Sequence, residues 1–232
     1  MLREAIEFLM NQGKTEVIEL NGQKYSTHLL SHIKLVSPES IRISTLSGLV
    51  DYIKANDTHA GTGLYVHVAN YDEVRLYSGL KSDASRDCYI LCKAETPKIT
   101  FGSFMDMENF NIMLQACFER TDDRDKILSV VGNIKEESVK AVGDDGVSQQ
   151  VTARVGIARV GDVVVPNPVI LQPFRTFAEV EQPMTKFVFR MQSGPRAALI
   201  EADGGAWKAA TMLCIKEYLS KELDGTGVKI IA

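Results

Sequence analysis

Ala197-Ala-Leu-Ile-Glu-Ala-Asp-Gly-Gly-Ala-Trp207 runs from a short apolar segment through two glycines into the clearest helical pattern of the chain. The helix is predicted over about residues 206–223, where apolar side chains recur at helical spacing: Trp207, Thr211, Ile215, Tyr218 and Leu219. Asp224-Gly225 and Gly227 are typical of a helix end. The stretch therefore predicts a strand that leads directly into a helix, followed by a closing strand at residues 228–231.

Working outward, residues 133–200 show the alternation of half-buried strands. One face of the first strand is apolar and the other polar, with Val147, Val151, Ala153, Val155 and Ile157 opposite Ser148, Gln150, Thr152 and Arg154. A later strand alternates in the same way, with Phe187, Phe189 and Met191 opposite Lys186, Val188 and Arg190. Prolines 166, 168, 173 and 183 indicate edges and loops rather than a central strand.

Two further patterns in the sequence contribute to the predicted fold class. Between residues 104 and 131 the apolar period changes to three and four, which predicts two helices, with Thr121 or Asp122 capping the second. Asn21-Gly22 between short β-prone runs indicates a hairpin. We expect an α+β protein with a largely antiparallel sheet, two central helices and a long C-terminal helix. Residues 1–232 would form a single domain, with two possible lobes, 1–103 and 133–232, joined by helices at 104–132.

Composition indicates an ordinary globular protein, since 45% of the 232 residues are hydrophobic and 24% are charged. The 26 basic and 30 acidic residues give a net charge of −4, so strong non-specific binding to nucleic acid is not expected. The four cysteines fit neither a disulfide framework nor a zinc pattern. With no signal peptide and no membrane-spanning run, we expect a soluble protein of the cytoplasm that contacts no membrane and needs no metal or cofactor.

One part of the chain departs from this mild charge balance. Residues 151–200 hold six basic and three acidic residues. Four of them are candidate ligand-binding residues, because the planar guanidinium group can donate two hydrogen bonds to one phosphate: Arg154, Arg175, Arg190 and Arg196. If the polar strand faces that carry Arg154 and Arg190 belong to one sheet, with Arg175 and Arg196 on the adjoining loops, the four arginines would line a single groove. The alternative is that they lie on solvated strand faces.

The junction before the C-terminal helix has three interpretations. Gly204 and Gly205 would leave free backbone N–H groups at a helix start, where phosphates bind. Asp203 would instead cap the helix, and its carboxylate would repel an anion. A third interpretation makes Glu201 and Asp203 ligands of a cation, for which two carboxylates are weak support.

Three segments carry a resemblance to a known family. Pro173-Phe-Arg-Thr-Phe-Ala-Glu-Val-Glu-Gln-Pro183, Phe187-Val-Phe-Arg190 and Ala198–Lys208 resemble the YfdQ-like family of phage and prophage proteins, over about residues 165–220. The family has no established catalytic residues, so none can be assigned by the resemblance. The resemblance implies a phage-encoded protein of the host cytoplasm that acts on DNA, nucleotides or host defence.

These observations lead to three functional hypotheses. The first is a self-assembling, non-enzymatic accessory protein of the early DNA-metabolism or anti-defence type, a homo-oligomer that binds DNA, RNA or nucleotides. The second is a metal-dependent nuclease or nucleotide hydrolase that uses scattered carboxylates such as Glu179, Glu181, Glu201 and Asp203. The third is a structural shell or scaffold protein. No nucleophile motif or phosphate loop is present in the sequence, which favours the first.

Overall fold

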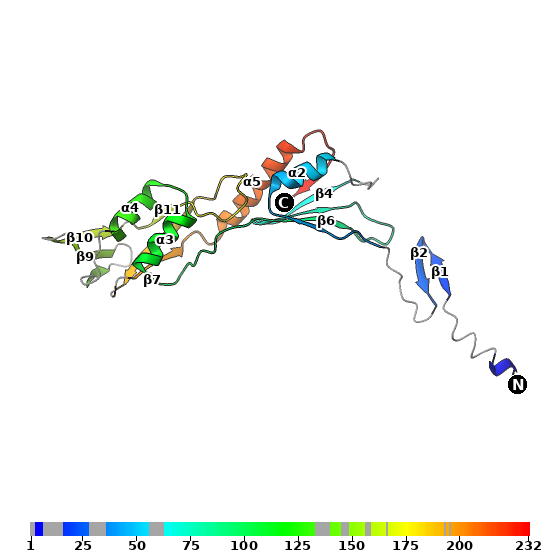
Figure 1. Cartoon of the computed structure of the whole chain (residues 1–232), viewed down its shortest axis with the longest axis horizontal. Helices are drawn as coiled ribbons and strands as arrows, with labels where there is room; N and C mark the ends of the chain where they lie inside the picture. The colour runs from blue at the N-terminus through cyan, green and yellow to red at the C-terminus, as the bar shows by residue number, and fades with distance from the viewer. Residues whose placement is uncertain are drawn as a thin grey trace.

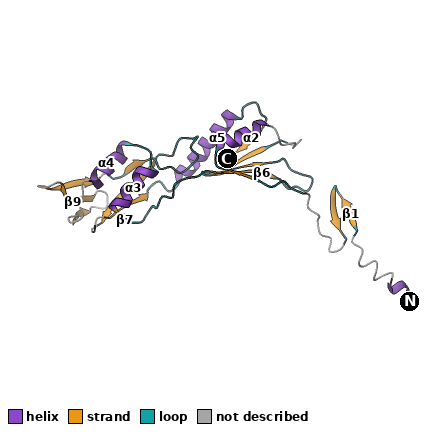
Figure 2. Cartoon of the chain, in the orientation of Figure 1, coloured by secondary structure: helices purple, strands orange, loops and turns teal. Residues whose placement is uncertain are grey.

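The computed structural model describes residues 3–6, 16–27, 36–55, 63–132, 140–144, 149–155, 159–165, 167–192, 194 and 196–232. The protein is α+β, and most of its strand pairs are antiparallel, as expected from the sequence. Figures 1 and 2 show two lobes side by side, each with a sheet covered by helices, and an N-terminal hairpin beside one of them, where Gln23 Nε2 donates to the carbonyl of Ser82 at 3.2 Å. Among the described helices, none is long and apolar enough to cross a membrane.

The first lobe is built on a five-stranded sheet with the order β14-β4-β5-β6-β3. Its strands are β3 (Ile41–Ile43), β4 (Tyr65–Asn70), β5 (Glu73–Tyr77), β6 (Cys88–Lys93) and β14 (Lys229–Ile231). The three central strands form an antiparallel meander, whereas β14 is parallel to β4 and β3 is parallel to β6. Parallel neighbours require a crossover connection, which helices α2 and α5 help to provide.

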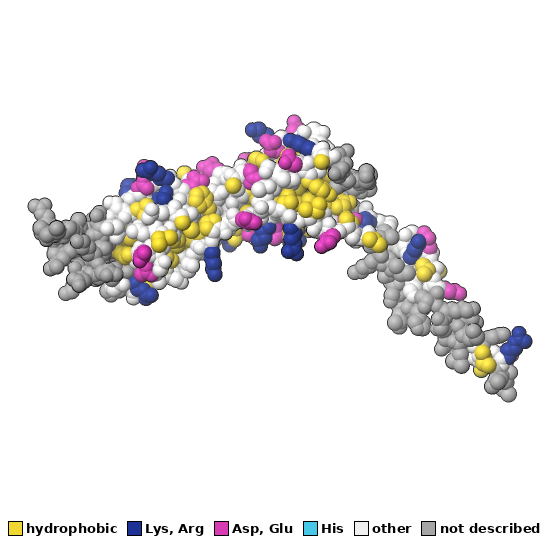
Figure 3. Space-filling view, in the orientation of Figure 1, with side chains coloured by type: hydrophobic (Ala, Val, Ile, Leu, Met, Phe, Trp, Pro, Cys, Tyr) yellow, Lys and Arg dark blue, Asp and Glu magenta, His cyan; other side chains and the backbone are white. Residues whose placement is uncertain are grey.

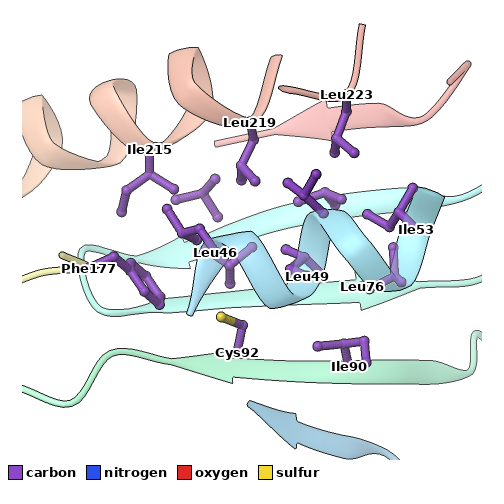
Figure 4. Packing of buried hydrophobic residues seen from close by; sticks show 14 of the residues in the cluster. Leu46, Leu49, Ile53, Leu76, Ile90, Cys92, Phe177, Ile215, Leu219 and Leu223 are labelled. Carbon is purple, nitrogen blue, oxygen red and sulfur yellow. The ribbon is translucent and has the colours of Figure 1, made fainter. Parts of the chain in front are cut away.

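Helices α2 (Leu46–Ala55) and α5 (Ala206–Glu222) cover one face of this sheet (Figure 1). Their apolar faces and that of the sheet form a shared core (Figure 4) that includes Leu46, Leu49, Ile53, Leu76, Ile90, Cys92, Ile215 and Leu219. The buried positions of α5 recur every four residues, at Trp207, Thr211, Ile215 and Leu219, as its sequence pattern predicts. Burial also raises the pKa of the Cys92 thiol to about 12, so this group remains protonated.

The second lobe has a four-stranded antiparallel sheet with the order β11-β12-β13-β7. Its strands are β7 (Met105–Asp106), β11 (Val169–Leu171), β12 (Thr185–Gln192) and β13 (Arg196–Glu201). Helices α3 (Met107–Cys117) and α4 (Asp122–Gly132) pack on it, and the core includes Phe110, Leu114, Ile127, Phe187 and Phe189. Strand β11 lies at an edge, which agrees with the prolines around it.

Two smaller sheets complete the described structure. Strands β1 (Val17–Leu20) and β2 (Gln23–Ser26) form the expected hairpin, with φ of 54° at Asn21 and 75° at Gly22. Strands β8 (Lys140–Asp144), β9 (Gln149–Val155) and β10 (Arg159–Val165) form a three-stranded antiparallel sheet. The expected turn at residues 144–146 falls mostly outside the described residues.

The two hydrophobic cores divide the chain differently from the lobes 1–103 and 133–232 suggested by the sequence. Helix α5 and strand β14 contribute to the first core, although they lie at the C-terminal end of the chain. Helices α3 and α4 do not merely join the lobes, because they supply the core of the second. The apolar face of α5 is buried on β4 and α2, so the chain returns to the first lobe after forming the second.

Residues 172–183 connect the lobes through a buried network of hydrogen bonds. The N–H of Phe174 donates to the carbonyl of Cys117 in the second lobe, at 2.9 Å, and Thr176 Oγ1 donates to the carbonyl of Tyr71 in the first, at 2.5 Å. The buried Gln182 side chain accepts from the N–H of Arg175 at 2.8 Å and donates to the carbonyl of Phe177 at 3.1 Å. These bonds satisfy backbone groups that would otherwise be buried without partners.

Candidate nucleic-acid interface

Arg175, the first of the candidate arginines, is buried at the junction of the two lobes. Its side chain is 6% exposed, and its Nη2 forms an ion pair with Oε1 of Glu201 at 2.9 Å. The guanidinium carbon lies 4.3 Å from the ring centre of Trp207 and 4.7 Å from that of Phe101. Burial lowers the pKa of Arg175, an effect that nearby carboxylates oppose. Arg175 is therefore not part of an open phosphate-binding groove.

The remaining three arginines are divided between two sheets. Arg190 pairs with Ala198, and Arg196 pairs with Gln192, so both arginines lie on the outer face of β12 and β13. Glu201, the partner of Arg175, pairs with Phe187 on the opposite, core-facing side. Arg154 lies in the separate three-stranded sheet, opposite Val160, and its side chain is outside the described structure. The single groove expected from the sequence is therefore not formed, because Arg175 is buried beside Glu201, which strand alternation puts on the other face from Arg190 and Arg196.

The two candidate cation ligands interact with the protein itself. The carboxylate of Asp203 accepts hydrogen bonds from the N–H groups of Gly205 at 3.0 Å and Trp207 at 3.2 Å, so it satisfies donors at the start of α5 as expected, although the N-cap residue itself is Gly205. Glu201 is paired with Arg175. Within the described part of the chain, no group of three or more His, Cys, Asp or Glu residues is arranged to hold a metal ion.

A different surface, the outer face of the five-stranded sheet, gathers cationic and aromatic side chains. Strand alternation buries Val66, Val68, Val74 and Leu76 beneath the helices, and consequently turns the residues between them outward. No described element covers this outer face (Figure 1). We call it the open face and define it by Arg42, Tyr65, His67, Glu73, Arg75, Tyr77, Arg86, Leu91, Lys93, Lys229 and Ile231.

The charge of the open face differs from that of the whole chain. Five of its residues are cationic (Arg42, Arg75, Arg86, Lys93 and Lys229), and only Glu73 is acidic, whereas the chain carries a net charge of −4. Figure 3 shows basic side chains projecting from the side of this sheet opposite to α2 and α5, with acidic ones between them. The positive charge is thus concentrated on one surface, which attracts anionic ligands more strongly than the net charge suggests.

Tyr65 is at the centre of the cationic group. The guanidinium carbon of Arg86 lies 4.5 Å from the ring centre of Tyr65, and the ammonium nitrogen of Lys229 lies 5.6 Å from it. Tyr77 pairs with Tyr65 across β4 and β5, so the two rings occupy adjacent positions on the sheet. Arg86 Nη1 also donates to the carbonyl of Ser78 at 2.9 Å. Because both cations lie over the ring of Tyr65, a base that stacks on this ring must displace them toward its phosphates.

Arg75 is held in place beside these tyrosines. Its Nη1 donates to the hydroxyl of Tyr77 at 3.3 Å, and its Nε donates to the carboxylate of Glu73. The hydrogen bonds to Tyr77 and Glu73 raise the pKa of Arg75, which therefore stays charged at any physiological pH. An aromatic and cationic sheet surface of this kind can stack bases on its rings and bind phosphates with its cations.

Sequence reasoning missed the open face because its cations come from five separate segments, between residues 42 and 229. The available signal was the alternation within residues 65–77, where Tyr65, His67, Arg75 and Tyr77 occupy the polar positions of two strands. No charge count along the chain could have brought Arg42 and Lys229 to the same surface. No protein-family model, no curated protein and no solved structure matches this chain.

Proposed function

We propose that the protein binds single-stranded nucleic acid on the open face of its five-stranded sheet. The observation that carries the proposal is the pair Tyr65 and Tyr77, adjacent on an uncovered sheet face and surrounded by cationic side chains. Bases would stack on the two rings, and Arg86 and Lys229 would move from the face of Tyr65 to the phosphates on either side.

Single strands fit this surface better than duplexes. The bases of a single strand are free to stack on protein rings, and stacking contributes about 1–3 kcal/mol per base. In a duplex the bases are already stacked on each other, so only the phosphate contacts would remain. The predicted preference is therefore single-stranded over double-stranded, with little dependence on base sequence.

The biological setting is also a proposal, and the resemblance of residues 173–208 to the YfdQ-like family supports it. We place the protein in a phage or prophage, acting in the host cytoplasm as a non-enzymatic homo-oligomer in early DNA metabolism or anti-defence. We prefer binding to metal-dependent hydrolysis because three of the four candidate carboxylates are engaged within the protein, whereas the fourth, Glu181, is exposed. Glu201 pairs with Arg175, Asp203 accepts hydrogen bonds at the start of α5, and Glu179 accepts hydrogen bonds from the N–H and hydroxyl of Ser47 at the start of α2.

Fluorescence anisotropy with labelled oligonucleotides of about 15 nucleotides, close to the upper site size of small binding domains, tests the proposal. Single-stranded DNA and RNA should bind, and a duplex of the same length should bind more weakly. If about four phosphates are contacted, the affinity for a single strand should fall with salt with a log–log slope of about 3. Absence of binding to every oligonucleotide at low salt, or stronger binding to the duplex, would reject the proposal.

A further inference from the structure

A cavity of about 270 Å³ opens at the junction of the two lobes, away from the open face. Its walls come from both lobes and from the segment that connects them, and they include Tyr71, Phe101, Arg175, Glu201, Trp207 and Lys208. Junctions between structural units are common positions for ligand sites, and this volume is close to the lower end for small-molecule pockets. The cavity can therefore enclose the ring of a ligand, while the rest of the ligand lies at its open mouth, where Lys208 is exposed.

The cavity combines aromatic rings with two cations, Arg175 and Lys208, and one carboxylate, Glu201. The rings of Tyr71 and Trp207 have centres 4.6 Å apart. The ammonium nitrogen of Lys208 lies 5.7 Å from the ring centre of Tyr71 and 5.8 Å from that of Trp207. The side chain of Glu201 is 38% exposed, so its carboxylate can still accept hydrogen bonds from a ligand.

Buried donors without acceptors give a second indication of a ligand. Within the described structure, Nε and Nη1 of Arg175 and Nε1 of Trp207 have no hydrogen-bond partner. Both side chains are more than nine-tenths buried and both line the cavity. A buried donor without an acceptor is unfavourable, and such groups in a native protein usually indicate a missing water or ligand. An oxygen-bearing ligand at the inner wall would supply the missing acceptors.

These features select a ligand class. A planar ring fits the aromatic walls, a phosphate fits Lys208, and an amine on the ring fits the carboxylate of Glu201. We propose that the cavity binds a nucleoside monophosphate whose base carries an exocyclic amine. The base packs against Tyr71 and the accessible edge of Trp207, and the phosphate pairs with Lys208. This site is separate from the open face and does not depend on the function proposed for that face.

Trp207 provides a direct test, because it is the one tryptophan among the 232 residues and lies in the cavity wall. Its fluorescence, excited at the red edge of its absorption, should change saturably when GMP, AMP or CMP is added. UMP lacks the exocyclic amine and inorganic phosphate lacks the ring, so both should bind at least about tenfold more weakly. No saturable change with any nucleotide, or equal binding of inorganic phosphate, would overturn the proposal.

A matched pair of variants assigns the binding to the cavity. Lys208→Ala should weaken nucleotide binding at least about tenfold, since a charge-assisted phosphate contact is lost. The control is Lys221→Ala, which makes the same change on an exposed lysine at the other end of α5. This variant should leave the affinity for nucleotides unchanged. Glu201→Gln should reduce the preference for GMP over UMP, with circular dichroism to verify folding. Equal effects of Lys208→Ala and Lys221→Ala would overturn the assignment.

The open face and the cavity can be distinguished in the same assay. The double variant Arg42→Glu with Lys229→Glu changes exposed residues of the open face only. Nucleotide binding should survive this change even if oligonucleotide binding is lost. Loss of the Trp207 signal in this variant would assign nucleotides to the open face and reject the cavity site.

Discussion

The buried guanidinium of Arg175 and the half-exposed carboxylate of Glu201 form an ion pair, with Nη2 2.9 Å from Oε1. Arg175 comes from the segment that connects the two lobes, and Glu201 ends strand β13. Three aromatic rings, those of Phe101, Phe187 and Trp207, lie within 5.2 Å of the guanidinium carbon. The stability of a buried charge in this position depends on its ionic partner, because most of the other groups around it are apolar.

Removing the carboxylate alone should therefore lower the free energy of unfolding more than removing both charges. Glu201→Gln is expected to lower the free energy of unfolding by about 1–3 kcal/mol, below the range for fully buried pairs because Glu201 is partly exposed. The double variant Glu201→Gln with Arg175→Met should recover part of this loss, because methionine keeps the contacts with the rings. Urea denaturation measures both. A double variant less stable than Glu201→Gln alone would contradict the account.

Trp207 is the largest side chain that α5 buries, with 7% of its surface exposed. Trp207→Ala should lower the free energy of unfolding by about 3–5 kcal/mol, since a large cavity would remain. Leu213→Ala is the control, because Leu213 lies on the same helix but is 57% exposed, and should change stability by less than about 0.5 kcal/mol. An unchanged melting temperature in Trp207→Ala would show that the residue does not anchor the helix.

Asp123 should make the second lobe sensitive to acid. Its carboxylate accepts hydrogen bonds from the N–H of Ile170 and from the ammonium of Lys126, both at 2.9 Å. These bonds lower the pKa of Asp123 in the folded protein, so their stabilisation is present above the unfolded pKa of about 3.9 and is lost as pH falls through the folded value.

Asp123→Asn should consequently lower the free energy of unfolding by about 1.5 kcal/mol at neutral pH, the lower end for a charged hydrogen bond. The difference from wild type should shrink as the pH falls below about 4. Urea denaturation over a pH series measures this, with the exposed neighbour Asp122→Asn as the control. A difference that does not depend on pH would mean that the charge of Asp123 is not responsible.

The sequence predicted the helices and the alternating strands better than it predicted their assembly. The spacing of apolar residues was sufficient to predict α5 and its buried face, because helical periodicity is a local property of the chain. The buried residues are Trp207, Thr211, Ile215 and Leu219. The return of α5 to the first lobe was not predictable, since no local pattern specifies which sheet an apolar helix face will cover. The same reason explains the sites: Arg175 lies in the sequence near Arg190, but the fold buries Arg175 and leaves Arg190 on the opposite face.

Self-assembly is expected to use the outer face of the second sheet. Ile170, in the edge strand β11, and Ile200, in the inner strand β13, lie on this face and are 46% and 40% exposed. Exposed apolar groups at a sheet edge favour contact with another copy. Analytical ultracentrifugation should give a mass that is a multiple of 25.6 kDa, and Ile170→Asp with Ile200→Asp should lower it. A mass of 25.6 kDa for the wild type at micromolar concentration would reject the homo-oligomer.

A comparison of two double charge reversals tests the central claim, binding on the open face, most directly. Arg42→Glu with Lys229→Glu alters the open face, and Lys186→Glu with Arg196→Glu makes the same change of charge at exposed positions of the second sheet. Anisotropy with a labelled single strand should show at least about a tenfold loss of affinity for the first variant, since phosphate contacts disappear. The second variant should bind nearly as well as wild type. Equal losses in both variants, or a loss confined to the second, would contradict the assignment of the nucleic-acid interface to the open face.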